Sequence, residues 1–198
     1  MLGLPSTTEV GKRIPKEAFY RNLQLDKRTR AEFVSLIDRM TIANSVKAST
    51  ANIGDGKEVH EIIVLAIELK GNEVPRRAIE VIAKNNQHRL VFRIEGAGVT
   101  CVVRNGLHSS DAIDSLALRG SNLDEAWDSI VAQVALGSED GKDVDGRIAV
   151  RKRRAELEKE IAVLDAKCRK ERQISKRNEL FVMLRSKEAE LEALGKGE

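Results

Sequence analysis

The chain of 198 residues has few of the residues that build common metal and cofactor sites. It contains two cysteines, three histidines and three prolines, and aromatic residues make up 3% of it. Cys101 and Cys168 belong to no Cys-x-x-Cys pair or Cys/His cluster, so we expect two reduced thiols rather than a disulfide or a zinc site. The histidines are scattered along the chain, and we therefore expect no bound metal and no cofactor.

Long apolar runs are missing as well. Residues 1–19 lack the apolar stretch of a signal peptide, and no apolar run approaches the roughly 20 residues that cross a bilayer. These absences predict a soluble, cytoplasmic protein with no membrane partner. The sequence also lacks a Gly-x-Gly-x-x-Gly or Walker-type phosphate loop and a glycine-flanked nucleophilic serine, which argues against nucleotide-dependent enzymes and serine hydrolases.

Glycine and proline are absent from residues 147–194, where charged residues surround a helical pattern. The polar run 169–179 separates two apolar stripes, so we predict a hairpin that folds back near 173–175, with Ser175 as the N-cap of its second helix. A single rod of about 70 Å is the alternative, since the bend contains no glycine or proline. The first stripe consists of Leu157, Ile161, Leu164 and Cys168, and the second of Leu180, Leu184, Leu191 and Leu194.

The basic charge of the chain is local. Residues 147–198 contain 15 Lys/Arg and 10 Asp/Glu, while the preceding 146 residues contain 19 and 21. Such a basic arm can bind phosphates or a protein partner, although interleaved glutamates also suit a solubilising helix surface with i,i+4 ion pairs. The candidate binding residues are Arg151, Lys152, Arg153, Arg154, Lys167, Arg169, Lys170, Arg172, Lys176 and Arg177.

The rest of the chain predicts a small α+β domain. The run 60–70 is apolar on both faces through its middle, which is typical of a central strand, and the crossover that follows must make a parallel pair. The patterns predict helices after Pro15, over 28–45 and over 75–86, strands over 60–70, 89–95, 99–104 and 116–119, and a helix capped by Asn122. We expect a mixed sheet with flanking helices in a globular domain of residues 1–136, a flexible acidic linker over 137–146, and a helical hairpin or coiled-coil arm over 147–195.

One pattern resembles an enzyme site. Glu68 and Lys70 lie two residues apart at the end of the central strand, and Asp55 lies upstream. Nucleases of the D…(D/E)xK kind use such residues to hold Mg²⁺ and activate water. The motif consists of three common residues, and Asp55 lies between two glycines, so the charges can simply mark where the strand leaves the core. Mg²⁺ is expected only if this nuclease hypothesis holds.

Several stretches together resemble one known family: GLPSTTEVGKRIPKEAFYRNL (3–23), STANI (49–53), EIIVLAIELK (61–70), LRGSNLDEAWDSIVAQVA (118–135) and the arm from 156 to 194. It is an uncharacterised family of small bacterial proteins, catalogued as a domain of unknown function. The resemblance implies genes beside helicases and DNA methyltransferases in restriction or phage-defence loci. It supplies no catalytic residues.

The sequence therefore favours a non-catalytic accessory subunit of a DNA-processing or phage-defence complex that docks through its basic arm. A helicase or a DNA methyltransferase is the expected protein partner. The Mg²⁺-dependent nuclease and a stand-alone nucleic-acid-binding protein are the alternatives, and self-association of the arm also stays open.

Overall fold

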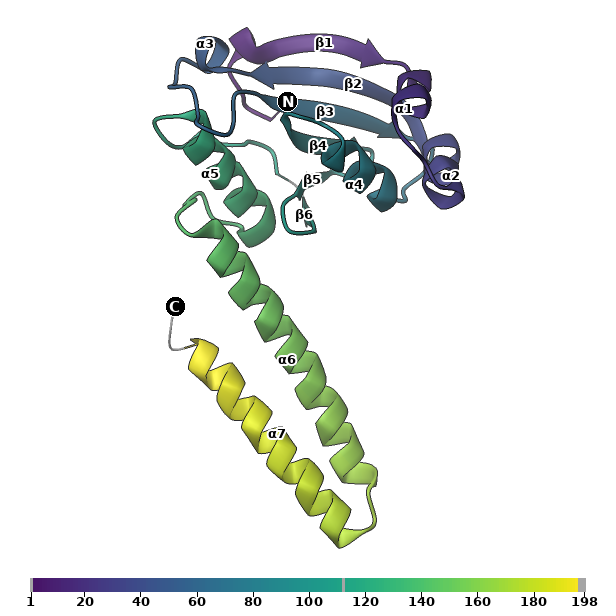
Figure 1. Cartoon of the computed structure of the whole chain (residues 1–198), viewed down its shortest axis with the longest axis vertical. Helices are drawn as coiled ribbons and strands as arrows, with labels where there is room; N and C mark the ends of the chain where they lie inside the picture. Colours follow the sequence, from purple (N-terminus) through teal and green to yellow (C-terminus); the bar gives the residue numbers. More distant parts are fainter. Residues whose placement is uncertain (1, 112, 196–198) are drawn as a thin grey trace. The chain divides into compact units, whose positions relative to one another are not determined.

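The computed structural model describes residues 2–111 and 113–195. The chain divides into two compact units, residues 1–144 and 145–198. The first unit is a six-stranded sheet with flanking helices, and the second is a hairpin of two helices (Figure 1). The predicted α+β class and the helical hairpin are confirmed. None of the helices in the described part of the chain combines the length and the apolar composition of a membrane span.

The six strands follow one another across the sheet in chain order. All neighbours are antiparallel except β3 and β4, which are parallel because α4 crosses over between them. The predicted central strand and its parallel neighbour are thus confirmed, and β4 and β5 form an antiparallel hairpin that turns at residues 96–98. The strands are β1 (Glu9–Ile14), β2 (Ile37–Val46), β3 (Ile62–Leu69), β4 (Arg89–Glu95), β5 (Val99–Val103) and β6 (Leu107–Asp111).

Three helices cover one face of the sheet and enclose the main core. The Phe33 ring is fully buried there, with its centroid 5.6 Å from that of Phe19 and 5.9 Å from that of Tyr20. Ile67 and Phe92 contribute to the same cluster from β3 and β4. These helices are α1 (Lys16–Asn22), α2 (Lys27–Ser35) and α4 (Arg76–Lys84); the others in this unit are η1 (Ser6–Thr8), α3 (Ala48–Ala51) and α5 (Leu123–Leu136).

The prediction of a helix over residues 28–45 is wrong in its second half, where the chain forms β2. The misleading apolar spacing comes from two irregularities in the pairing of β2 with β3, one between Ile37 and Arg39 and one between Ile42 and Asn44. An extra residue at a bulge shifts the alternation of side chains. Ile37 and Met40 therefore both reach the core although they are three residues apart, and this spacing imitates a helix.

The strand predicted over 116–119 is also wrong, because the side chain of Gln133 on α5 takes the place of a neighbouring strand. Gln133 Oε1 accepts a hydrogen bond from the Ala117 amide, and its Nε2 donates to the Ala117 carbonyl, both at 2.9 Å. The backbone is satisfied without a sheet partner. The predicted capping of α5 by Asn122 is confirmed, since its side chain accepts a 3.0 Å bond from the Glu125 amide.

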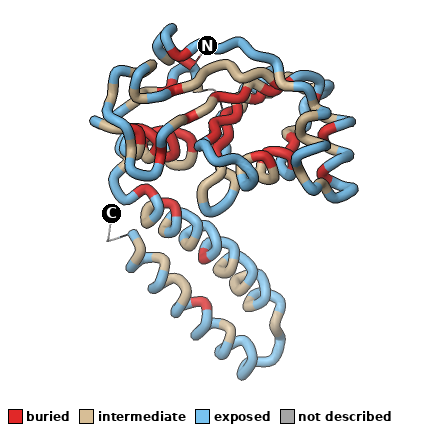
Figure 2. Tube along the Cα trace, turned by 45° about the horizontal axis from the view of Figure 1, so that its top comes forward, coloured by how far each residue is buried: buried red, intermediate tan, exposed pale blue. Residues whose placement is uncertain are grey.

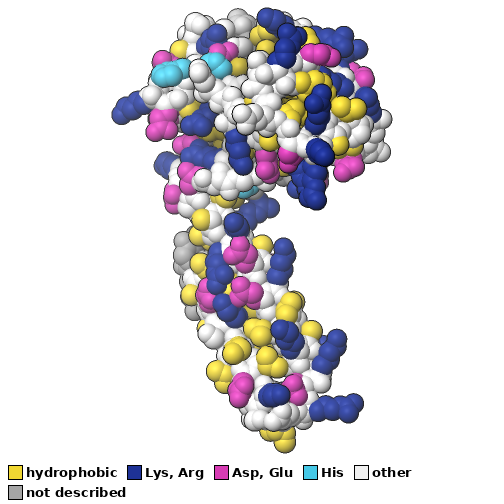
Figure 3. All heavy atoms as spheres, turned by 45° about the vertical axis from the view of Figure 1, so that its right-hand side comes forward, with side chains coloured by type: hydrophobic (Ala, Val, Ile, Leu, Met, Phe, Trp, Pro, Cys, Tyr) yellow, Lys and Arg dark blue, Asp and Glu magenta, His cyan; other side chains and the backbone are white. Residues whose placement is uncertain are grey.

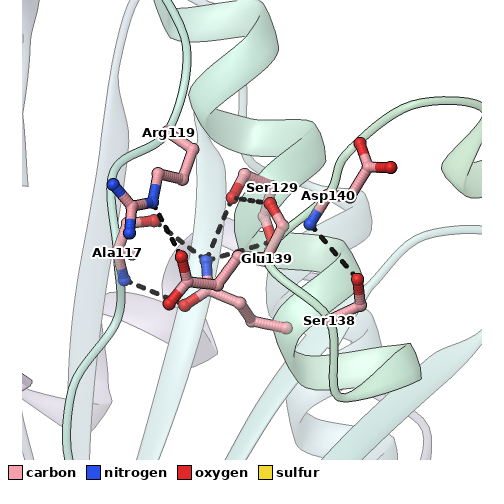
Figure 4. Close-up of polar contacts among 7 residues, drawn as sticks. Ala117, Arg119, Ser129, Ser138, Glu139 and Asp140 are labelled. Carbon is pink, nitrogen blue, oxygen red and sulfur yellow. Dashed lines mark hydrogen bonds and ion pairs between the residues drawn. The ribbon is translucent and has the colours of Figure 1, made fainter.

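Residues 138–140, within the predicted linker, form hydrogen bonds with the rest of the first unit (Figure 4). The Glu139 carbonyl accepts a 2.7 Å bond from the Ser129 hydroxyl of α5, and its carboxylate accepts a 2.7 Å bond from Arg119. The Asp140 amide donates to the Ser138 hydroxyl at 3.2 Å. Whether the segment is flexible in solution stays a prediction.

The hairpin consists of α6 (Val144–Lys170) and α7 (Ile174–Gly195). The fold back at 171–173 confirms the hairpin and excludes a single rod. Because α7 begins at Ile174, Ser175 lies in its first turn, and the prediction of Ser175 as N-cap is wrong. Leu157 is fully buried and Leu184 is 7% exposed, while most of the hairpin is exposed or half-buried (Figure 2).

Candidate interaction surface on the hairpin

The structure does not bring the three nuclease candidates together. Glu68 lies near the C-terminal end of β3 and Lys70 just beyond it, whereas Asp55 precedes the strand. Six residues of extended chain, about 20 Å, separate Ile62 from Glu68. The carboxylate of Asp55 instead contacts His60 Nδ1 at 3.0 Å. Among the described residues, no group of three or more His, Cys, Asp or Glu could hold a metal ion.

Glu68 and Lys70 both have structural partners. Glu68 pairs with Arg39 across β2 and β3 at 3.4 Å. Lys70 Nζ donates to the Val34 carbonyl at the end of α2, at 2.8 Å, where a cation complements the partial negative charge of the helix terminus. Lys16 donates to the nearby Ile37 carbonyl, and its burial, followed by the charge of Lys70, lowers its pKa. This geometry gives Lys70 the role of a helix cap.

The cluster predicted at 151–154 is largely engaged within the hairpin. Arg153 contacts Glu190 of α7 at 2.5 Å and also pairs with Glu156 and Glu160, each at 3.6 Å. The hydrogen bond to Glu190 is the main cause that raises the pKa of Arg153. Arg154 pairs with Glu158 at 3.6 Å, and Arg151 is also engaged, while Lys152 is exposed. Within this cluster, Arg153 therefore joins the two helices of the hairpin.

The second predicted cluster gathers at the turn between the two helices. Residues 167–177 contain six Lys/Arg and one Asp/Glu, and all six basic side chains are exposed. Arg169 pairs with Asp165 at 2.7 Å. The three on α6 also complement the partial negative charge of its C-terminus. We call this set the basic turn; it consists of Lys167, Arg169, Lys170, Arg172, Lys176 and Arg177.

Exposed apolar side chains lie next to the basic turn, and the sequence analysis missed them. Seven large hydrophobic side chains are exposed in the described residues, and five of them belong to the hairpin between 163 and 183. Apolar and basic side chains alternate over this half of the hairpin in Figure 3. We call these five the distal apolar residues; their exposed fractions are 53% for Val163, 67% for Ile174, 49% for Phe181, 68% for Val182 and 56% for Met183.

Three of the distal apolar residues belong to one uninterrupted run, Leu180–Leu184. Five consecutive positions point to all sides of a helix, and α6 covers only the side of Leu184. On another side, Val163 and Met183 line a shallow apolar groove between α6 and α7. Arg185 stacks over the Phe181 ring, 5.1 Å from its centroid. The signal in the sequence was this run, which exceeds what a two-helix hairpin can bury.

A family model with the description "Domain of unknown function (DUF4391)" matches residues 2–105 and 102–191, nearly the whole chain. The chain belongs to this family. The resemblance to an uncharacterised family is thereby confirmed. No curated protein and no solved structure matches the chain. Because the family description carries no activity, the roles of residues in this member rest on geometry alone.

Proposed function

We propose that this protein is a non-catalytic accessory subunit that joins a larger assembly through the distal half of its hairpin, which is the half that contains the basic turn and the distal apolar residues. The observation that supports this most directly is the concentration of exposed large hydrophobic residues there, five of the seven in the described chain. Surface hydrophobic residues that occur singly are ordinary, whereas a group of them surrounded by charge marks an interaction surface.

Leaving these apolar side chains in water is unfavourable. Burying apolar surface contributes about 25 cal/mol per Å², so covering the exposed part of one such residue is worth on the order of 1–2 kcal/mol. A helix that is apolar on several sides is normally enclosed by neighbours. A run of exposed apolar residues lowers solubility, and the stacking of Arg185 on Phe181 leaves Val182 and Met183 exposed. A partner that covers α7 removes this cost.

The basic turn indicates what kind of surface the partner presents. An apolar centre with an acidic rim would match the distal apolar residues and the six cations beside them. We propose a bacterial DNA-processing or phage-defence complex in the cytoplasm as the assembly, with a helicase or a DNA methyltransferase as the partner. This part of the proposal rests on the family resemblance and on the lack of a converging catalytic site among the described residues.

The test is affinity purification of the tagged protein from its native host after nuclease treatment, with mass spectrometry of the co-eluting proteins. The variant is Val182→Gln with Met183→Gln, two exposed positions where glutamine keeps the helix. The control is Val34→Gln, at a valine on α2 that is 54% exposed, close to the 56% of Met183. We expect a stoichiometric helicase or methyltransferase with the wild type and the control, and its loss with the double variant. Recovery of the wild type alone would refute the proposal.

The basic turn supports a second candidate, direct binding of nucleic acid. The variant Arg172→Glu with Lys176→Glu separates the two functions. A nucleic-acid binder should lose affinity for duplex DNA in this variant, and the wild type should bind with a steep salt dependence. The affinity of a nucleic-acid binder for DNA should also be unchanged by Val182→Gln with Met183→Gln. Salt-insensitive or absent DNA binding removes this candidate.

A further inference from the structure

The first unit contains an apolar pocket that the proposed function does not use. Its volume is about 280 Å³, close to the lower limit of roughly 300–1,000 Å³ for small-molecule sites. The pocket opens between α1, α4 and the helix-covered face of the sheet. Every lining side chain is apolar or a carboxamide, and the main ones are Phe19, Ile42, Ile63, Leu65, Ile82 and Leu90.

A cluster of polar side chains surrounds the carboxylate of Glu61, which is 15% exposed. Ser45 Oγ donates to Glu61 Oε1 at 2.5 Å. Lys47 Nζ and His88 Nδ1 approach the other oxygen, Oε2, at 3.5 and 3.6 Å. Both oxygens of Glu61 are therefore engaged, and one largely buried carboxylate positions an ammonium group and an imidazole at the same point.

The cluster continues the pocket along the same face of the sheet. Ser45 pairs directly with Ile63, a lining residue, so their side chains share a face. Glu61 precedes Ile63 by two residues, and side chains two apart along extended chain point to the same side. Asn86 also connects the cluster with the pocket, because it lines the pocket and its side chain accepts a 2.9 Å hydrogen bond from the His88 amide. The cluster therefore lies on the same face of the sheet as the pocket, next to the lining residues Ile63 and Asn86.

We infer that this pocket binds a small carboxylic acid with an apolar body. Both oxygens of Glu61 already have partners, whereas an ammonium group has three donors and an imidazole has two nitrogens. Lys47 and His88 therefore retain hydrogen-bonding capacity beyond their contacts with Glu61. Their side chains are 50% and 42% exposed, which lets them meet an incoming anion. The uncharged lining receives the apolar body.

The probe is decanoate, and decylamine is its counterpart of equal chain length and opposite charge. Both are titrated into the full-length protein, with binding followed by calorimetry and by thermal unfolding. We expect decanoate to bind and to raise the unfolding temperature with concentration, because a ligand that binds only the native state stabilises it. We expect no such shift with decylamine. No effect of decanoate, or an equal effect of the two probes, would overturn the inference.

Two variants test the two ends of the site. Lys47→Gln with His88→Gln removes the ammonium group and the imidazole and should weaken decanoate binding at least tenfold. Ala18→Leu on α1 adds bulk to a lining residue and should weaken it to a similar extent. The matched control is Arg89→Gln, which removes an exposed cation next to His88 that pairs with Glu58 at 3.9 Å and should leave affinity unchanged. Decanoate affinity that survives the double variant would refute the role of Lys47 and His88, whether or not the Ala18 variant folds.

Discussion

The carboxylate of Asp124 fixes the loop before β3 to the first turn of α5, and its replacement by asparagine has a predictable cost. Asp124 Oδ2 accepts a bond from the Lys57 amide at 2.6 Å. Its Oδ1 accepts bonds from the amides of Val59 at 2.8 Å and Glu58 at 3.2 Å. An asparagine side chain at this position would keep one acceptor oxygen, but its NH₂ group would face one of these donors.

The substitution Asp124→Asn therefore loses one charge-assisted hydrogen bond and weakens the others. A hydrogen bond to a charged group contributes about 1.5–3 kcal/mol. For a chain of this size, 1 kcal/mol shifts the unfolding temperature by about 2–4 °C, so we expect a decrease of roughly 3–12 °C at pH 7. The measurement is thermal unfolding by circular dichroism. The control is Glu58→Gln in the same loop, whose side chain is 82% exposed and should change stability by less than about 0.5 kcal/mol.

The pH dependence provides a second check on Asp124. Burial raises the pKa of this group, but the three backbone hydrogen bonds outweigh it, so the pKa in the folded protein lies below its ordinary value. The stabilisation is complete above the unfolded-state pKa of about 3.9 and is lost as the pH falls through the lower folded pKa. The difference between wild type and Asp124→Asn should therefore shrink in acid. A difference that persists there, or a variant as stable as the control at pH 7, would refute this account.

Two further predictions concern packing. Leu157→Ala removes a fully buried side chain from a hairpin with few others, and at a cost of about 2–5 kcal/mol we expect loss of hairpin helicity by circular dichroism while the first unit still unfolds cooperatively. Gly141→Ala places a methyl group 2.7 Å from the Ser129 amide nitrogen and 2.8 Å from the Asp128 carbonyl carbon, so it should lower stability by about 1–3 kcal/mol. Gly71→Ala, with nothing within 4 Å, should show no such loss, and equal unfolding temperatures for the two alanine variants would contradict the clash.

The parts of the fold that local patterns determine could be predicted from the sequence. The apolar run of β3, the cap at Asn122 and the two stripes of the hairpin each depend on neighbouring residues. The strand β2 could not be predicted, because its bulges arise from pairing with β3 and are invisible in β2 alone. Gln133 was likewise unpredictable as the partner of Ala117, since a side chain replaced a strand.

The candidate sites also divide into those that a local sequence pattern reveals and those that only contacts between distant segments create. The basic turn is continuous in sequence across one bend, and its residues could be identified without a structure. The cluster combines Ser45 and Lys47, Glu61, and His88 from three segments with no motif spacing, and only the register of the sheet brings them together. The exposure of Phe181 depends on which side of α7 faces α6, and the apolar pattern alone did not give it.

The contacts between the two helices of the hairpin are concentrated in the half that lies away from the turn. The ion pairs of Arg153 with Glu190 and of Lys187 with Glu160 join the helices, and neither lies nearer the turn than Glu160. Closer to the turn, Leu164, Cys168 and Leu180 are only half-buried. This half therefore has the weaker internal stabilisation and should open locally more readily than the ion-paired half. If a partner docks on this half as proposed, part of the binding free energy is offset by the ordering of the half next to the turn. Amide hydrogen exchange near the turn should then slow when the partner binds.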